Sequence, residues 1–126
     1  MPLENLDQVL QNCDKAKKVI LNAIYLGMGA GLSDTTNYIK EEFVWSKNGR
    51  GFNDITTNLR NSIKYNVDPP DDDKVIGTEY ASMEYAPYVE LRWEGAHAYL
   101  YPGVIDMTDK ILDEIKDAVK TAISVL

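Results

Sequence analysis

The run at residues 68–73 constrains the fold more than any other feature, because it reads Asp-Pro-Pro-Asp-Asp-Asp. A proline has no amide hydrogen to donate, and three successive aspartates favour a solvated turn over a strand. Before this run, Ile63, Tyr65 and Val67 alternate with polar residues, which is the period of a half-buried strand. Residues 74–78 are expected to return as the second strand. The sequence therefore predicts a long β-hairpin that needs further structure to be stable.

The first thirty residues predict an amphipathic helix whose apolar side chains recur three and four positions apart. Three glycines then stand at alternate positions, Gly27, Gly29 and Gly31. Each weakens a helix by about 1 kcal/mol relative to alanine. Either the helix breaks there, or another backbone packs closely on these small residues. We expect a break or kink, with Ser33 or Asp34 starting a second helix that runs to about Val44. The stripe of the first helix comprises Leu6, Leu10, Cys13, Ile20, Ala23 and Ile24.

A final helix is predicted from about Val104, after Pro102 and Gly103. Its apolar positions again recur at helical spacing, with charged residues on the other face. The expected fold is α+β: a small antiparallel sheet with a long β-hairpin, packed against N-terminal helices and a C-terminal helix. Residues 1–126 suit one domain. The stripe comprises Val104, Thr108, Ile111, Leu112, Ile115, Ala118, Val119 and Ala122.

Composition restricts the partners. The chain has 20 acidic and 13 basic residues, a formal net charge of −7. A protein that grips phosphates needs a basic patch, so we expect no sequence-specific nucleic acid as a partner. No apolar run approaches the ~18–20 residues of a membrane span, and the first ten residues lack the pattern of a secretory signal. The single cysteine, Cys13, excludes an internal disulfide and fits a reducing cytoplasm.

No arrangement typical of an enzyme, metal or cofactor site is found in the sequence. His97 is the single histidine, and no serine or aspartate is spaced to form a triad with it. Cys13 and His97 together are too few for a zinc site. Residues 47–51 lack the spacing of a phosphate-binding loop, and residues 71–73 lack the alternating acids of a calcium loop. We therefore expect a non-enzymatic protein with no cofactor and no metal.

The segment from Tyr80 to Tyr101 is rich in aromatic residues, and glutamates accompany them. Stacking on nucleobases would call for bases instead of acids. Tyrosine and tryptophan bring a large apolar area and a polar tip to cores and interfaces, so we expect both roles here. The aromatic residues are Tyr80, Tyr85, Tyr88, Trp93, Tyr99 and Tyr101.

Three short stretches resemble a family of phage tail components, which includes the gene-product-ten-like neck and tail-completion proteins of long-tailed phages. Residues 56–63, Thr-Thr-Asn-Leu-Arg-Asn-Ser-Ile, resemble its T-G-x-L-R-x-S-I signature. Residues 85–90, Tyr-Ala-Pro-Tyr-Val-Glu, resemble its Y-A-x-Y-V-E signature, and residues 98–102 are similar to its P-F-L-x-P element. The resemblance spans roughly residues 15 to 123. The chain departs from the family at Thr57, Arg92 and Ala98, where glycine, glycine and proline are usual.

The resemblance implies a structural virion assembly protein of a tailed phage or prophage. Such a protein acts at the head–tail junction or in tail completion, as a subunit of a homo-oligomeric ring. It is made in the host bacterial cytoplasm and ends in the virion. Its other partners would be neighbouring head-completion or tail-tube and terminator proteins. The residues expected at partner interfaces are Arg60, Tyr88, Glu90, Arg92, Trp93 and Tyr99.

Two points stay open in the sequence. Arg60 could form an ion pair inside its own chain, with Glu90 as a candidate partner, or a pair between subunits. Tyr88, Trp93 and Tyr99 could be core residues, interface residues or both. Two other functions also fit: a small non-enzymatic ligand-binding or regulatory protein whose aromatic segment lines a pocket, or a host-directed phage accessory factor.

Overall fold

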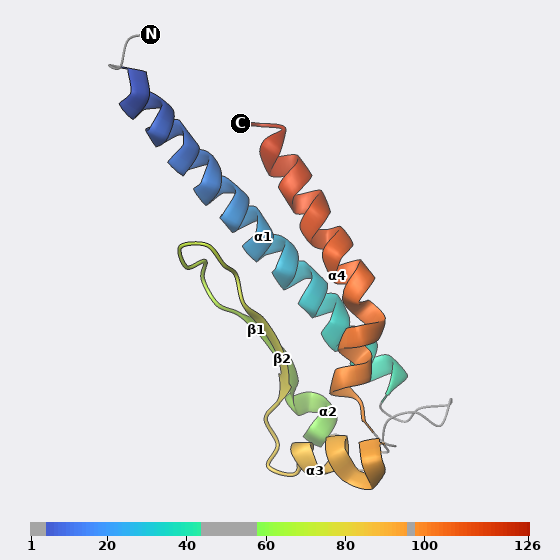
Figure 1. Cartoon of the computed structure of the whole chain (residues 1–126). Helices are drawn as coiled ribbons and strands as arrows, with labels where there is room; N and C mark the ends of the chain where they lie inside the picture. Colours follow the sequence, from blue (N-terminus) through green and yellow to red (C-terminus); the bar gives the residue numbers. More distant parts are fainter. Residues whose placement is uncertain (1–4, 44–57, 96–97) are drawn as a thin grey trace.

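A computed structural model describes residues 5–43, 58–95 and 98–126 of the chain. Two long helices, α1 and α4, run antiparallel and in contact, and a β-hairpin lies along α1 (Figure 1). The protein is therefore an α+β protein, as predicted, with most of its described residues in helices. In chain order the elements are α1 (Leu6–Glu42), α2 (Asn58–Ser62), β1 (Ile63–Val67), β2 (Gly77–Ala81), α3 (Ala86–Leu91), the 3-10 helix η2 (Arg92–Gly95) and α4 (Leu100–Ile123).

Helix α1 is continuous over 37 residues, so the expected break at Gly27–Gly31 is wrong. The glycines serve the close packing of α4 instead. A β-carbon on Gly31 would lie 2.9 Å from the Cα atom of Ile111, and one on Gly27 would meet the backbone of α4 in the same way. Packing of the two helices outweighs the low helix propensity of glycine. No second helix starts at Ser33 or Asp34, and Val44 lies outside the described residues.

The hairpin turns at residues 68–73, as predicted, and its first strand has the predicted bounds. The register pairs Ile63 with Ala81 and Val67 with Gly77. The second strand starts at Gly77 and not at residue 74, because the prolines at 69 and 70 have no amide hydrogen with which to continue the ladder. Near the tip, Asp71 and Lys74 exchange two backbone hydrogen bonds of 3.1 and 2.8 Å.

The C-terminal helix α4 is present and begins at Leu100, earlier than the predicted Val104. Proline is tolerated in the first turn of a helix, because the amide hydrogens there have no partner within the helix. Pro102 and Gly103 are therefore inside α4 and do not precede it.

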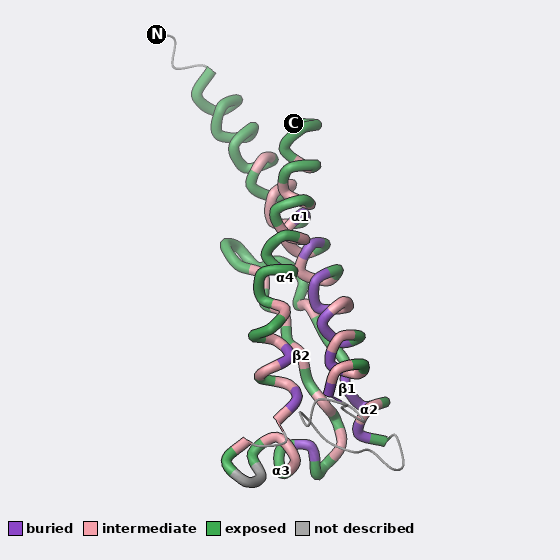
Figure 2. Tube along the Cα trace, turned by 90° about the vertical axis from the view of Figure 1, so that its right-hand side faces the viewer, coloured by how far each residue is buried: buried purple, intermediate pink, exposed green. Residues whose placement is uncertain are grey.

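The core lies at one end of the molecule. Figure 2 shows buried residues where the C-terminal part of α1 meets α2, β1 and the start of α4, whereas the opposite ends of α1 and α4 are exposed. Tyr38 and Phe43 meet edge to face beside this core, with ring centroids 6.0 Å apart. The molecule is thus a packed base from which two helices and a hairpin project. The core cluster comprises Ile39, Phe43, Leu59, Ile63, Ala86 and Tyr99.

Candidate functional site

The aromatic segment connects the hairpin to α4 through α3 and η2, and Glu90 holds the connection together. Its carboxylate accepts hydrogen bonds from the backbone amides of Tyr99 and Tyr101, both at 2.8 Å, and of Leu100 at 3.0 Å. These amides belong to the start of α4, where amide hydrogens lack partners within the helix and the dipole favours negative charge. Tyr99 itself makes no side-chain cap. Glu90 therefore caps α4 from outside the helix.

Tyr99 is a core residue of the single chain, with no exposed surface. Its hydroxyl donates a hydrogen bond to the backbone carbonyl of Ala86 at 3.2 Å. Burial raises the pKa of Tyr99 above its ordinary value, and the charge of Glu90 and the nearby Tyr85 add to the rise. A partner cannot touch this ring in the described conformation, so the structure places Tyr99 in the core and not on the contact surface predicted for it.

Other side chains of the aromatic segment remain on the surface. Tyr88 is 62% exposed on α3, and Leu91 lies one turn further along the same helix. Tyr101 is exposed in the first turn of α4, and its amide binds Glu90 beside them. We call Tyr85, Tyr88, Leu91 and Tyr101 the aromatic patch. Large apolar side chains left exposed on neighbouring elements are candidates for contact with other proteins.

The remaining predicted interface residues are placed less fully. Arg60 is half-buried in α2, directly before β1. Glu90 accepts hydrogen bonds from backbone amides at the start of α4. This role differs from the ion pair with Arg60 that the sequence suggested. Arg92 and Trp93 contribute their backbone to η2, but their side chains, like His97 and residues 56–57, lie outside the described part. The interface prediction for these residues stays a prediction.

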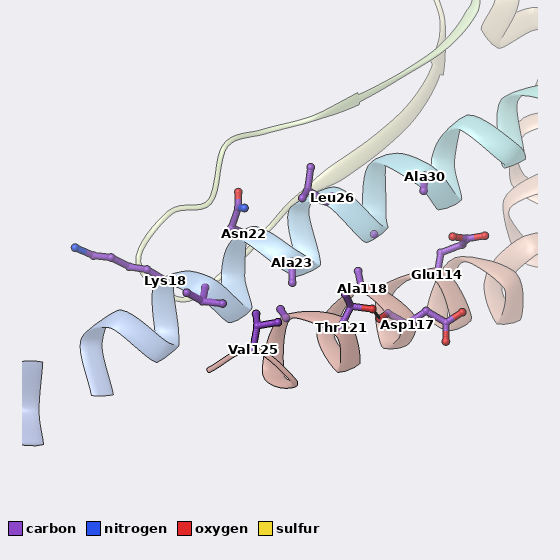
Figure 3. Close-up of a pocket in the computed structure, with 13 residues that line it drawn as sticks. Lys18, Asn22, Ala23, Leu26, Ala30, Glu114, Asp117, Ala118, Thr121 and Val125 are labelled. Atoms are coloured by element: carbon purple, nitrogen blue, oxygen red, sulfur yellow. Dashed lines mark hydrogen bonds between the residues drawn. The ribbon is translucent and has the colours of Figure 1, made fainter. Parts of the chain in front are cut away.

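A groove between α1 and α4 was not foreseen from the sequence. It lies at the exposed end of the helix pair, holds about 740 Å³, and has a mostly apolar lining (Figure 3). Several small side chains line this open groove, and charged ones stand at its edges: Lys18 on α1, Glu114 and Asp117 on α4. The sequence does contain the alanines that line the groove on each helix. Only the pairing of α1 with α4 shows that they border the same groove. The α1 residues are Lys18, Val19, Asn22, Ala23, Leu26, Gly27 and Ala30, and the α4 residues are Glu114, Asp117, Ala118, Thr121, Ala122 and Val125.

A half-buried acid, Glu79, joins the hairpin to α1. It forms a short hydrogen bond with the hydroxyl of Thr36, which also bonds the Leu32 carbonyl at 3.0 Å. Its second oxygen is buried and has no partner among the described residues. Burial raises the pKa of Glu79 to about 7, against the lowering effects of Thr36 and Lys40. Because one hydroxyl proton cannot serve two acceptors, a protonated Glu79 donating to Thr36 satisfies the whole chain of bonds.

Neither a candidate metal site nor a candidate membrane-spanning helix is found among the described residues. Among residues 5–43, 58–95 and 98–126, no group of three or more His, Cys, Asp or Glu could hold a metal ion. None of the helices in these ranges is both long and apolar enough to span a bilayer.

Comparisons with known proteins add no relative. No protein-family model matches the sequence. Neither the search of curated proteins nor that of solved structures finds a significant match.

Proposed function

We propose that the protein is a structural subunit of a tailed phage or prophage virion, working at the head–tail junction or in tail completion. Two kinds of observation support this proposal. The first is the resemblance of residues 56–63, 85–90 and 98–102 to the phage tail-component signatures. The second is the amount of apolar surface that a single chain leaves uncovered.

The uncovered surface carries the proposal. Leu6, Val9 and Leu10 are each about half exposed at one end of the molecule, and Tyr88, Leu91 and Tyr101 are more exposed at the other. A monomer of this size has little reason to keep two apolar areas on opposite ends, whereas a subunit with neighbours on both sides needs them. This surface supports contacts with neighbouring subunits, and the resemblance supplies the proposed place of those subunits in a virion ring.

The aromatic patch suits a neighbouring head-completion, tail-tube or terminator protein. Its rings are large, they offer polar tips, and they stand on α3, which the Glu90 cap fixes against α4. Rigid aromatic anchors of this kind contribute most of the binding energy at many protein interfaces.

The alternative function, a ligand-binding or regulatory protein, has one observation in its favour. A cavity of about 310 Å³ adjoins the aromatic segment, lined by Tyr80, Pro87, Leu91 and their neighbours. The larger groove, however, lies between α1 and α4 and not on the aromatic segment. This candidate would predict saturable binding of a small apolar molecule to the monomer.

Deletion of the coding sequence from the phage or prophage tests the proposal. After induction, electron microscopy of the lysate should show filled heads and tails that are not joined or tails that are incomplete. Expression of the wild-type chain from a plasmid should restore joined particles, and the chain should be detected in them by mass spectrometry. Infectious particles in normal yield from the deletion strain would contradict the proposal.

A further inference from the structure

We propose that residues 6–15 of α1, the N-terminal arm, dock into the α1–α4 groove of a second copy of this chain, so that copies associate head to tail. This inference rests on the proposed function, because it names the contact through which the subunits of a ring would join. It goes beyond the aromatic patch, which we assign to other virion proteins.

The arm is a helix that the rest of the described chain does not cover. All of its residues are exposed, and Leu6, Val9 and Leu10 keep 52%, 49% and 54% of their surface in contact with solvent. The hairpin tip meets α1 at the C-terminal end of the arm, where Lys17 forms an ion pair with Asp73 at 2.5 Å and Asp14 lines one hollow with residues 70–72. Figure 1 shows the arm extending past the end of α4 as well. An apolar helix face is therefore presented to solvent along nearly three turns.

The arm has the side-chain spacing of a helix that binds in a groove. Leu6, Val9, Leu10 and Cys13 stand at positions i, i+3, i+4 and i+7, the anchor pattern of helix-in-groove recognition. The groove supplies small side chains to receive them, because Ala23 and Ala30 on α1 and Ala118 and Ala122 on α4 all line it. Large side chains of one helix against small ones of two others give interdigitated packing.

The lengths also agree. At 1.5 Å per residue, the arm is about 15 Å long, the groove wall from Lys18 to Ala30 about 18 Å, and the wall from Glu114 to Val125 about 17 Å. A third helix seated there would complete a three-helix arrangement at the end of the molecule where two helices now stand alone.

Charge at the rims selects one orientation for the arm. Asp7 and Asp14 lie seven residues apart on one edge of its apolar stripe, and the uncharged Asn12 lies on the other. The α1 rim of the groove carries Lys18, whereas the α4 rim carries Glu114 and Asp117. The acidic edge of the arm is attracted to the first rim and repelled by the second. Rim charges of this kind fix register and direction more than affinity.

The geometry of α1 makes the association head to tail. At 3.6 residues per turn, the apolar stripe of the arm and the groove face of the same helix are about 120° apart around its axis. Two straight copies therefore cannot fill each other's grooves in a reciprocal dimer. A contact between two different surfaces of one chain either closes into a ring or continues as a filament.

Sedimentation of three full-length double variants tests the docking. The arm variant is Leu6→Glu with Leu10→Glu, the groove variant is Leu26→Glu with Thr121→Glu, and the control is Ile105→Glu with Leu112→Glu, whose residues are exposed on α4 but do not line the groove. Wild type and control should self-associate, whereas the arm and groove variants should dissociate about tenfold more readily or more. Circular dichroism checks that all four chains are folded.

Mixing gives the decisive result. An equimolar mixture of arm and groove variants retains one competent contact per pair, so it should form heterodimers and nothing larger. Absence of heterodimers, a wild type that stays monomeric up to about 1 mM, or an arm variant that assembles like wild type would each overturn the proposal.

Disulfide trapping identifies the occupant of the groove. With Cys13 on the arm, Thr121→Cys in the groove should give disulfide-linked multimers on oxidation, and Thr108→Cys on α4 outside the groove should not. A groove filled by a small apolar molecule or by another protein would leave Thr121→Cys unlinked. If the arm variant is monomeric but heads and tails still join, the proposed function is wrong and the docking stands. If rings form without the arm, the docking is wrong and the proposed function stands.

Discussion

A β-carbon placed on Gly27 would lie 2.7 Å from the Cα atom of Ile115, so α1 and α4 are in backbone contact at this turn. Gly27→Ala must push the helices apart, and overpacking of this kind costs about 1–3 kcal/mol. Gly29 is two residues away in the same helix with nothing within 4 Å of its missing side chain. Gly29→Ala should therefore stabilise the protein by up to about 1 kcal/mol through helix propensity. Urea unfolding followed by circular dichroism compares the two, and equal stabilities would contradict the packing account.

The raised pKa of Glu79 predicts a pH dependence of stability. The folded chain holds this proton up to about pH 7, whereas the unfolded chain releases it near the ordinary glutamate pKa of 4.5. The folded state therefore binds more protons between these values, and this contribution falls as pH rises from about 4.5 to 7. After allowance for the partial exposure of Glu79, the loss should be about 1–2 kcal/mol.

Glu79→Gln is the matched control for that prediction, since an amide resembles the protonated acid and does not titrate. The variant should exceed wild type in unfolding free energy at pH 8 and approach it at pH 5, as measured by urea midpoints at both values. A difference between the two chains that does not change with pH would show that Glu79 titrates normally.

The Glu90 cap predicts a loss of stability at the start of α4. Glu90→Gln keeps the size of the side chain but removes the charge that three amides bind, which should cost about 1–2 kcal/mol. Glu84→Gln, at an exposed acid in the same segment, should change stability by less than about 0.5 kcal/mol. Thermal unfolding of the two variants distinguishes a cap from a general effect of charge.

The aromatic segment should divide into residues for folding and residues for binding. Tyr88→Ala should leave the fold intact and weaken binding to purified heads or tails by about 2 kcal/mol. Tyr99→Ala should instead destabilise the core by about 3–5 kcal/mol. Circular dichroism reports the folding effect, and cosedimentation with particles from the deletion lysate reports the binding. If Tyr88→Ala binds these particles as wild type does, the aromatic patch is not the contact surface.

Local patterns were enough to predict the hairpin and α4, but not the short helices α2, α3 and η2. The alternation around Tyr65 and the proline-aspartate turn predicted the hairpin, and the apolar spacing after Val104 predicted α4. The bounds were displaced where backbone hydrogen bonding decides them, as at Gly77 and Leu100. These details depend on which amides find partners, and residue type alone does not determine that.

Features that join segments distant in the sequence could not be predicted from the sequence. Gly27 and Gly31 predict either a break or a close contact, and only the presence of α4 opposite them decides the outcome. The cap by Glu90, nine residues before Tyr99, and the burial of Glu79 against Thr36 arise in the same way. The groove exists only when the two helices are paired. The sequence could thus predict that the aromatic segment contributes to the core and to contacts. It could not say which of the aromatic residues are buried and which are exposed.

The ion pair between Lys17 and Asp73 marks a boundary within one helix. On its C-terminal side, α1 is packed along α4 and the hairpin, so its amides should exchange with deuterium only through large-scale unfolding. On its N-terminal side, residues 6–15 are all exposed, and a helix with fewer than about 12–15 residues is marginal in water unless other parts of the protein pack on it. Amides of residues 6–15 should exchange far faster than those of residues 23–39 in the monomer, and should slow markedly once subunits join. Hydrogen exchange measured by mass spectrometry would then show two rates of amide exchange within one helix. The faster-exchanging part, residues 6–15, would become a stable helix only when subunits join.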